Sequence, residues 1–446
     1  MVQYEVKVIR DLAVEWLPTT GLRTNPRNAR THSKRQLQAL AGCIREVGFT
    51  NPVIVDEDGM ILAGHGRVGA AKLLGLDKVP VIRIGALSEA QKRAYVLADN
   101  KLAERAGWDR DMLAVELGEL SVLLPAVDLS LDLTGFETGE IDVVLADHEE
   151  KAQSSRDDEV GLAPETAVSR VGDLWRLGRH RIFCGDARDE ASLGLLLGDE
   201  RADMVFTDPP YNVPIEGHVM GRGGVKHPEF AMASGEMSES EFRDFLALVL
   251  GHAVRVSRDG ALHYVAMDWR HIADLVEAGK PIYSGLRNIC VWTKSNGGQG
   301  SLYRSQHELF AVFKVGEGEH ANNVELGRFG RNRSNVWSYA GVNTFKVGRQ
   351  EELAFHPTVK PAALVADAIK DVTSRHAIVL DLFGGSGTTL IAAERTGRRA
   401  RLIEIEPRYV DVTIRRFETL TKSDAVHAET GRIFAEEAAV RGGSIH

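Results

Sequence analysis

Hydrophobic and polar residues follow two different spacings along this chain. From Lys34 to Val47 the apolar positions recur every three or four residues, which predicts a helix. Two short β-branched runs then flank the turn Asp56–Gly59 and predict a pair of strands. A second helix is predicted from about Arg67 to Leu76, and it leads to the strand-like run Val79–Ile84. These elements predict a small α/β module early in the chain.

Further along, short apolar runs alternate with helical patterns. This alternation is typical of a parallel sheet that is covered by helices on both faces. The predicted strands are Arg181–Cys184, Asp203–Phe206, Leu262–Ala266, Asn288–Trp292, Glu308–Phe313, Ala377–Leu380 and Ala400–Ile403. Between the second and third of them, the apolar residues from Phe242 to Val254 keep helical spacing after an acid-rich start. The pattern therefore predicts a large second α/β domain.

The segment from Asp147 to Val168 separates the two patterns. It is rich in charge and small polar residues and has no sustained apolar period, so we interpret it as a flexible linker. The predicted domains are a small α/β domain (1–110), a helical segment with the linker (111–168), a large α/β domain (169–420) with an insert at about 212–350, and a C-terminal tail (421–446).

The composition is that of a globular protein, because 43% of the 446 residues are hydrophobic and 26% are charged. No apolar run approaches the roughly 18 residues of a membrane-spanning helix, and the first residues lack the order of a signal peptide. We therefore expect a cytoplasmic protein without a membrane partner. Cys43, Cys184 and Cys290 make no Cys-x-x-Cys pair, so we expect neither a disulfide framework nor a metal site.

Charge gives a mixed indication of the partner. The formal net charge of −9 at pH 7 disfavours a polyanion, but binding depends on local patches. Two basic clusters are candidates for nucleic-acid contact: Arg27, Arg30 and Arg35 within the acid-free run Arg23–Arg45, and Arg328, Arg331 and Arg333 among the aromatic residues Phe329, Trp337 and Tyr339. The alternative for each cluster is a solvated basic face.

The first chemical motif is TDPPYN. Asp208, Pro209, Pro210 and Tyr211 come directly after a predicted strand, and ligands of open α/β sheets bind at the carboxyl ends of strands. Successive prolines fix the backbone and donate no hydrogen bond, so the loop offers carbonyl acceptors beside a carboxylate. A base amine, with its N–H donors, is a suitable partner. Alone, the motif would also suit a proline-stiffened turn.

The second motif is the glycine-rich turn DLFGGSGTTL, Asp381 to Leu390, which connects a predicted strand to a helix. Glycines let the backbone approach a ligand, and the N–H groups at a helix start favour negative charge. The lysine of a phosphate-binding loop is missing after Gly387, where Thr388 and Thr389 stand. Glu404 ends the next strand, at a separation from which an acid can bind ribose hydroxyls. Together the motifs favour a nucleotide-like cofactor beside an amine-binding loop.

The segment from about Ser169 to Glu418 resembles the DNA amino-methyltransferases in which the catalytic motif precedes the cofactor motif. TDPPYN matches the D-P-P-Y of that family, FGGSG matches its F-x-G-x-G, and HPTVKP (His356–Pro361) matches the element before the cofactor strand. The resemblance implies a Rossmann-like, seven-stranded, mostly parallel sheet in which the catalytic and cofactor strands are neighbours. It also implies S-adenosylmethionine as cofactor and double-stranded DNA as partner.

The resemblance assigns roles residue by residue. Asp186 stands where the family is thought to touch the adenine ring of the cofactor, and Glu404 stands where it holds the ribose. The catalytic residues implied are Asp208, Pro209, Pro210 and Tyr211, and the cofactor-binding residues are Asp186, Ala187, Lys360, Asp381, Phe383, Gly384, Gly385, Gly387, Thr388 and Glu404.

The first 110 residues or so resemble the ParB-like domain of partition proteins. NPRNARTHS (25–33), ILAGHGRVGAAKLLG (61–75) and ADNKLAE (98–104) carry the likeness. Partition proteins hold nucleotide phosphates with a Gly-Glu-Arg-Arg type box, and here Gly66 stands in place of an arginine, which puts nucleotide chemistry in doubt. We expect this module to raise DNA affinity without taking part in catalysis.

The function predicted from these features is methyl transfer to the N6 amine of adenine in DNA, with the base flipped out of the duplex against Tyr211. The alternatives are cytosine-N4 methylation, a non-enzymatic ParB-like DNA adaptor, and methylation of RNA or protein amines. The target sequence cannot be derived from the chain. The oligomeric state stays open, with a homodimer as one option.

Overall fold

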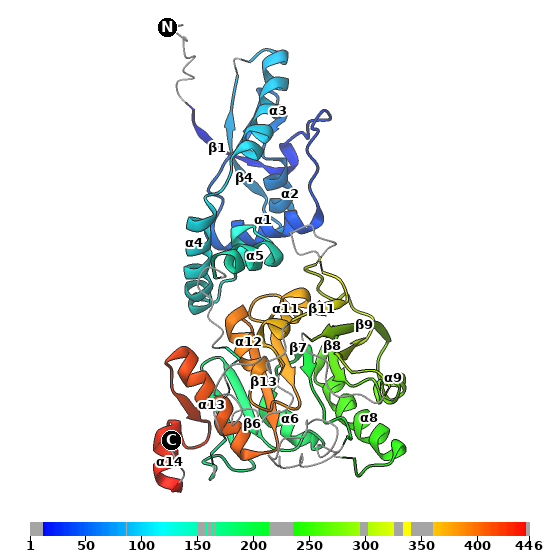
Figure 1. Ribbon diagram of the computed structural model, residues 1–446. Coiled ribbons are helices and arrows are strands. Elements are labelled where there is room, and N and C mark those ends of the chain that lie inside the picture. The colour runs from blue at the N-terminus through cyan, green and yellow to red at the C-terminus, as the bar shows by residue number, and fades with distance from the viewer. Residues whose placement is uncertain are drawn as a thin grey trace. The chain divides into compact units, whose positions relative to one another are not determined.

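A computed structural model describes residues 12–85, 87–149, 157–158, 160, 163–164, 166–213, 235–294, 302–324, 333–339 and 360–442. It divides the chain into two compact units, Met1–Glu150 and Lys151–His446 (Figure 1). No helix within the described residues is long and apolar enough to cross a membrane. The same residues contain no cluster of three or more potential metal ligands.

Unit 1 begins with a small mixed sheet in the order β1-β4-β2-β3. Ser33 caps its first helix, because the Ser33 hydroxyl accepts from the backbone N–H of Gln36 at 3.1 Å. The elements are β1 (Val14–Pro18), η1 (Thr19–Gly21), α1 (Lys34–Val47), β2 (Val53–Val55), β3 (Ile61–Ala63), α2 (His65–Leu73), β4 (Lys78–Arg83) and α3 (Glu89–Arg105). The helix predicted at 34–47 and the strands around the turn at 56–59 are confirmed.

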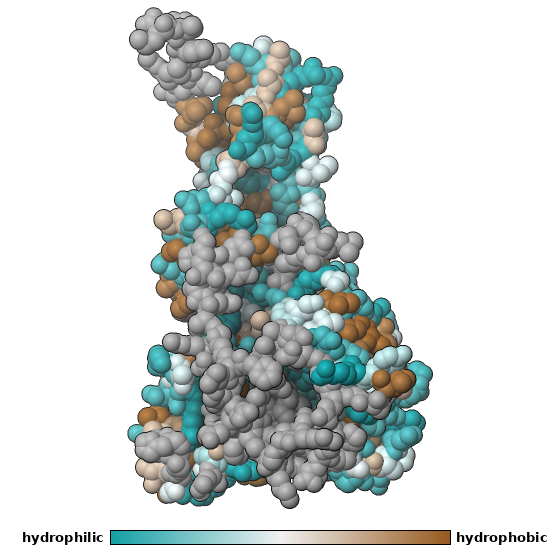
Figure 2. All heavy atoms as spheres, viewed as in Figure 1, coloured by the Kyte–Doolittle hydropathy of each residue, from teal (hydrophilic) through white to brown (hydrophobic). Residues whose placement is uncertain are grey.

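The second half of unit 1 is helical. It consists of α4 (Arg110–Leu123), η2 (Leu124–Val127), η3 (Leu131–Thr134) and α5 (Thr138–Glu149). These helices enclose a core of their own, made of Ala114, Leu117, Leu131, Ile141 and Val144. Elsewhere in the unit, hydrophobic residues gather over β1 (Figure 2), where Val14 and Trp16 are exposed on the edge strand.

Unit 2 is built on a large sheet. Its described strands are β5 (Leu174–Leu177), β6 (His180–Cys184), β7 (Ala202–Thr207), β8 (Ser257–Met267), β9 (Gly285–Thr293), β10 (His307–Lys314), β11 (Val336–Ser338), β12 (Ile378–Asp381), β13 (Arg399–Glu404) and β14 (Ala425–His427). They lie in the order β11-β9-β10-β8-β7-β12-β13-β6-β5-β14. The central run from β8 to β6 is parallel, whereas β10 is antiparallel to both β8 and β9. All seven predicted strands are confirmed.

Helices cover both faces of this sheet (Figure 1). One face packs against α6 (Glu190–Leu197), α8 (Glu239–Arg255) and α9 (Ile272–Gly279), and the other against α11 (Ala362–Val372), α12 (Thr388–Thr396), α13 (Pro407–Thr421) and α14 (Phe434–Arg441). A capping box starts α8, in which Ser238 accepts from the Glu241 N–H and Glu241 accepts from the Ser238 N–H. This doubly covered α/β arrangement confirms the predicted fold class.

The sheet is wider than the seven strands that the family resemblance implied, because β5, β14 and β11 extend it at the two edges. The segment 421–446 was predicted to be a tail outside the large domain. Within its described residues, β14 pairs with β5, and Phe434 and Ala438 of α14 lie in the main core. The local pattern missed this segment because its strand is three residues long and its pairing partner is far away in sequence.

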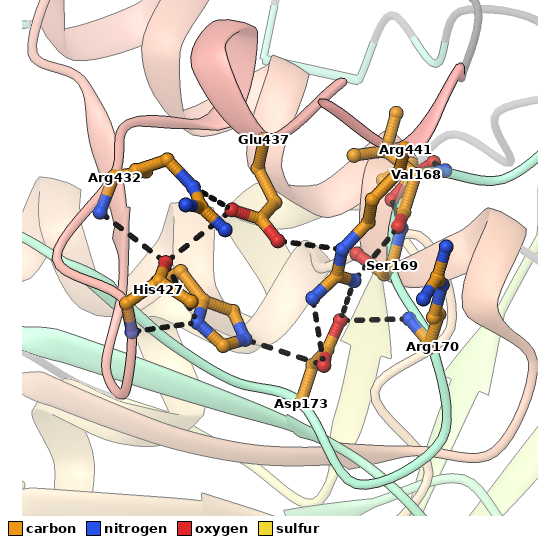
Figure 3. A network of polar contacts seen from close by, with 10 residues as sticks. Val168, Ser169, Arg170, Asp173, His427, Arg432, Glu437 and Arg441 are labelled. Atoms are coloured by element: carbon orange, nitrogen blue, oxygen red, sulfur yellow. Dashed lines mark hydrogen bonds and ion pairs between the residues drawn. The ribbon is translucent and has the colours of Figure 1, made fainter. Parts of the chain in front are cut away.

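A buried ionic network fastens this C-terminal segment (Figure 3). Arg441 binds Asp173, donates to the backbone carbonyl of Val168 at 3.0 Å, and donates to Glu437 at 2.6 Å. His427 lies 3.2 Å from the other oxygen of Asp173. Burial alone would raise the pKa of Asp173, but the Arg441 guanidinium and its other partners lower it.

We predict that Arg441→Met lowers the free energy of unfolding of unit 2 by about 3 kcal/mol, because it leaves two buried carboxylates without their shared cation. The matched control is Arg432→Met. Arg432 also binds Glu437 but is 41% exposed, so its loss should lower the free energy of unfolding much less than the loss of Arg441. Urea unfolding followed by tryptophan fluorescence measures both values. Equal losses in the two variants would contradict the role given to Arg441.

Candidate active site

The predicted motifs come together at one edge of the sheet. The strands β7, β12, β13 and β6 are consecutive neighbours and run parallel, so their carboxyl ends meet. The loop of Asp208 follows β7, the glycine turn follows β12, Glu404 ends β13, and Asp186 follows β6. Asp208 and Glu404, which are nearly 200 positions apart in the sequence, thus lie at the same edge of the sheet. The predicted catalytic strand and the predicted cofactor strand are therefore neighbours, as the family resemblance implied.

A buried hydrogen-bond pair joins the two central strands. The Thr207 hydroxyl, at the end of β7, donates to Asp381 Oδ1 at 3.0 Å and accepts from the Leu382 N–H at 3.2 Å. Asp381 Oδ2 accepts from the Thr389 hydroxyl at 2.7 Å. Burial raises the pKa of Asp381 to about 7, although these donors act in the opposite direction. Both oxygens of Asp381 thus accept hydrogen bonds from the protein. Through Thr207 and Thr389, Asp381 connects the ends of β7 and β12 to the start of α12, on either side of the glycine turn.

The glycine turn requires residues without side chains. Gly387 has a φ of 83°, and a Cβ there would lie 2.6 Å from the Thr413 methyl group. Gly384 lies against Leu402, which a Cβ would approach to 3.1 Å. Gly385 has a φ of 51°, and a Cβ there would meet no atom within 4 Å. The outer side of Gly385 therefore faces open space, as expected of a turn that a ligand approaches.

Glu404 lies directly beside this turn. Its carboxylate accepts from the backbone N–H of Gly385 at 2.7 Å and from that of Glu406 at 2.9 Å. Burial raises the pKa of Glu404 to about 7, although the backbone donors lower it in part. A buried carboxyl at the end of a parallel strand is well placed to accept hydroxyl donors of a ligand.

Asp186 and Ala187 lie at the end of the next strand. The backbone N–H of Gly185 donates to the Glu404 carbonyl at 2.9 Å, so the two strand ends are in register. The Asp186 carboxylate is 29% exposed and is paired with Arg188 at 2.7 Å, while Ala187 is buried.

Two other predicted cofactor residues lie in or next to the glycine turn. Phe383 contacts Phe245, with ring centroids 6.1 Å apart, and Thr388 is the first residue of α12.

The Asp208 carboxylate has two partners in the structure. Its Oδ2 lies 2.6 Å from the Lys360 ammonium, and its Oδ1 accepts from the Tyr211 hydroxyl at 2.6 Å. Burial and the neighbouring carboxylates of Asp208 and Glu308 raise the pKa of Tyr211, so its phenol stays a neutral donor. Pro209 is buried and Pro210 is partly buried beside them. Lys360 was predicted as a cofactor residue, and the structure instead places its ammonium on Asp208.

Two further ions at this site were not identified from the sequence. Glu308, near the start of β10, lies 2.9 Å from the Lys360 ammonium and also binds Lys294, which follows β9. Burial alone would raise the pKa of Glu308, but the two ammonium groups lower it to about 2. The four residues form an alternating series of charges: Asp208, Lys360, Glu308 and Lys294. The available signal was a glutamate inside an otherwise apolar strand pattern.

Asn212 closes the loop of Asp208. It has a φ of 53°, which is uncommon for a residue other than glycine. Its side-chain carbonyl accepts from the N–H groups of Gly235 and Met237, and its amide donates to the Met237 carbonyl at 2.8 Å. These bonds fix the backbone that follows Tyr211 to the residues that precede α8.

The predicted DNA-binding arginines differ in availability. Two of them, Arg328 and Arg331, lie outside the described residues. The same is true of residues 356–359 in the HPTVKP element, which was matched to the family for a different reason. Arg333 is paired with Asp371 at 2.7 Å and with Asp367 at 3.1 Å, and is 18% exposed, so its guanidinium is directed into the domain. In unit 1, Arg30 is paired with Glu104 and Arg35 with Glu137. Arg27 is exposed and has no ion-pair partner among the described residues.

Comparisons with known proteins agree with this geometry. A family model described as DNA methylase matches residues 202–415, one described as ParB N-terminal domain matches 5–101, and one described as ParB-methyltransferase HTH domain matches 111–171. The chain carries a ParB-like N-terminal domain, which is followed by a DNA methyltransferase domain of the N6/N4 family. S-adenosylmethionine is the methyl donor of such enzymes, so the predicted cofactor is confirmed.

Individual relatives match separate parts of this methylase. The ParB-like nuclease domain-containing protein YnaK of Escherichia coli (strain K12) is 46% identical over 82 residues, which are 18% of this chain and 94% of YnaK. The type II methyltransferase M.HinfI of Haemophilus influenzae is 25% identical over 240 residues, which are 50% of this chain and 64% of M.HinfI. The crystal structure of the M1.HpyAVI–SAM complex has a TM-score of 0.39 and 18% identity, and the match covers 53% of this chain and 97% of that one.

The residues at the sheet edge fit S-adenosylmethionine. Glu404 can accept ribose hydroxyls, the open side of Gly385 admits a ligand close to the backbone, and the start of α12 favours a carboxylate. The cofactor supplies an electrophilic methyl group when it is bound. The methylase itself contributes the carboxylate, the backbone donors and the shape of the turn.

We predict that S-adenosylmethionine binds the methylase more weakly as the pH falls from about 8 to about 6, by up to about tenfold per pH unit. The raised pKa of Glu404, about 7, means that its carboxyl is protonated in the free protein at the lower pH. Ribose hydroxyls favour the ionised form, so binding must release that proton. Calorimetric titration across the range measures the effect. Glu404→Gln should bind weakly with no such dependence, and a flat profile for the wild-type protein would rule out this contact.

Proposed function

We propose that this methylase transfers a methyl group from S-adenosylmethionine to the N6 amine of adenine in double-stranded DNA. The observation that supports the proposal best is the Asp208 carboxylate, which lies beside two proline carbonyls at the end of β7, next to the glycine turn that follows β12. The base preference rests on the D-P-P-Y motif, which is commonest among adenine-N6 enzymes. The alternative is cytosine N4, whose amine offers the same two donors.

The exocyclic amine of a base is a poor nucleophile because its lone pair is delocalised into the ring. In the proposed mechanism Asp208 and the Pro209 carbonyl accept the two amine hydrogens and favour a pyramidal nitrogen. Its lone pair would attack the methyl carbon in line, as the bond between that carbon and the sulfonium sulfur breaks and the sulfur keeps the electron pair. The amine takes the place of the Tyr211 hydroxyl on Asp208 Oδ1, and Glu308 Oε2, 3.4 Å from that hydroxyl, can accept from it instead. The methylated nitrogen then loses a proton to the carboxylate or to water.

Lys360 has a positioning role in this proposal. Burial alone would lower the pKa of Lys360, but Asp208 and Glu308 raise it, so the ammonium stays charged between them. It therefore prevents repulsion between two neighbouring carboxylates and holds Asp208 Oδ2, which leaves Oδ1 for the amine. Such fixed electrostatics can stabilise developing charge without reorganisation during the reaction.

We predict that Asp208→Ala reduces methyl transfer by about a thousandfold or more, while affinity for S-adenosylmethionine stays near that of the wild-type protein, because the carboxylate contacts the base amine. Asp244→Ala, a change of an exposed aspartate on α8, is the control. The readout is mass spectrometry of nucleosides from DNA that was treated with isotope-labelled cofactor.

N6-methyldeoxyadenosine is the expected product of the wild-type protein. N4-methyldeoxycytidine would establish the cytosine alternative and refute the base assignment. Residual turnover of Asp208→Ala within about tenfold of the wild-type rate would refute the role of the carboxylate.

We also propose that unit 1 raises DNA affinity without taking part in catalysis. A second binding site on the same chain increases the effective concentration of DNA near the first. The support is the run from Arg23 to Arg45, in which Arg27 is exposed without an ion-pair partner among the described residues.

We predict that Arg27→Ala weakens DNA binding by the full-length methylase and reduces the slope of log affinity against log salt by about 1, because fewer counterions are released. The rate at saturating DNA should not change. Arg255→Ala, which removes an exposed arginine paired with Glu190 in unit 2, serves as control. An unchanged salt slope in Arg27→Ala would indicate that Arg27 does not contact phosphate.

A further inference from the structure

Two residues in the middle of the presumed linker are bound to the catalytic unit. Asp157 and Asp158 are described residues within the segment 147–168, which the sequence pattern assigned to a flexible connection. The Asp157 carboxylate makes a bidentate pair with Arg395 of α12, at 2.7 Å and 2.9 Å. The Asp158 carboxylate accepts from the backbone N–H of Ala362 at 2.8 Å. The flexible-linker interpretation is therefore wrong for these two residues.

The contact of Asp158 lies at the start of α11, two positions after Lys360. Pro361 occupies the N-cap of this helix and provides no side-chain hydrogen bond. Asp158 supplies the missing acceptor from a distant part of the chain, and its negative charge suits the positive end of the helix. Lys360 is 5% exposed and its ammonium reaches both Asp208 and Glu308. Because Lys360 lies two residues before α11, the position of its side chain depends on where the first residue of α11 is held.

Asp157 reaches the other half of the site through Arg416 of α13. Arg416 donates to the Asp157 carbonyl at 2.7 Å and to the Ser386 carbonyl, inside the glycine turn, at 2.6 Å. Burial lowers the pKa of Arg416 to about 10, and the nearby Asp158 and Asp157 carboxylates oppose that effect. The Arg416 guanidinium thus connects Asp157 of the linker to the glycine turn.

We propose that Asp157 and Asp158 form a positioning clamp, which holds the start of α11 and hence Lys360, and which supports the glycine turn through Arg416. These two linker residues are thereby part of the catalytic architecture. The inference requires methyl transfer to DNA, and it does not depend on which base is methylated. It also implies that the catalytic unit must begin before Asp157 if it is to keep its geometry.

The test compares three substitutions in the full-length methylase. Asp158→Ala should lower kcat by about tenfold or more, since small displacements of reacting groups have large effects on rate, with little change in KM for DNA. Asp158→Asn should stay within about threefold of the wild-type kcat, because its amide oxygen can still accept from the Ala362 N–H. Asp244→Ala is the control for an exposed aspartate outside the clamp.

A second readout reports on Lys360 without catalysis. Mass spectrometry after brief treatment with an amine-acylating reagent measures how fast Lys360 is modified, with the exposed Lys101 of unit 1 as internal reference. Lys360 should react faster in Asp158→Ala than in the wild-type protein and in Asp158→Asn. Thermal unfolding of each variant shows whether the fold persists.

Two results would overturn the clamp. One is an Asp158→Ala protein with wild-type kcat and wild-type Lys360 reactivity. The other is an Asp158→Asn protein as impaired as Asp158→Ala, because the hydrogen bond would then not be what matters. If the wild-type protein itself methylates no DNA, the proposed function fails, and the reactivity of Lys360 still decides whether the clamp exists.

Discussion

The buried contact between Thr207 and Asp381 holds the two halves of the active site together. It joins the last residue of β7 to the last residue of β12, with a hydroxyl-to-carboxyl distance of 3.0 Å. The loop of Asp208 and the glycine turn begin at the next positions, so this contact fixes how far apart they lie. Both residues are buried, and each polar group would cost about 1–3 kcal/mol if it were left without its partner. The adjacency of the loop of Asp208 and the glycine turn thus rests on a buried hydrogen bond between two side chains.

The second constraint is electrostatic. Asp208, Lys360, Glu308 and Lys294 alternate in sign and come from four separate segments of unit 2. Buried ion pairs are weak evidence for stability, because well-packed apolar residues often serve as well. Their presence beside the loop of Asp208 therefore favours a functional reason, namely a carboxylate that is held in place before the substrate arrives.

Much of this architecture could be predicted from local sequence. The strands of the parallel sheet are short buried runs, and TDPPYN, FGGSG and Glu404 each follow or end such a strand, which places them at one edge. The contribution of Glu308 and Lys294 could not be predicted, because it depends on the register of the antiparallel strands β9 and β10. The ion pairs of Arg333 with Asp367 and Asp371 on α11 could not be predicted either, because these aspartates are more than 30 positions away in the sequence. Asp157 and Asp158 were missed because a polar, charged segment looks the same whether it is free or bound.

A crystal structure of the full-length protein with S-adenosylmethionine shows most directly whether the loop of Asp208 and the glycine turn form one site. We predict electron density for the cofactor along the carboxyl ends of β12 and β13, with its ribose against Glu404 and its methyl group directed towards Asp208. Density with the ribose away from Glu404, or with the methyl group directed away from the loop of Asp208, would contradict a single site.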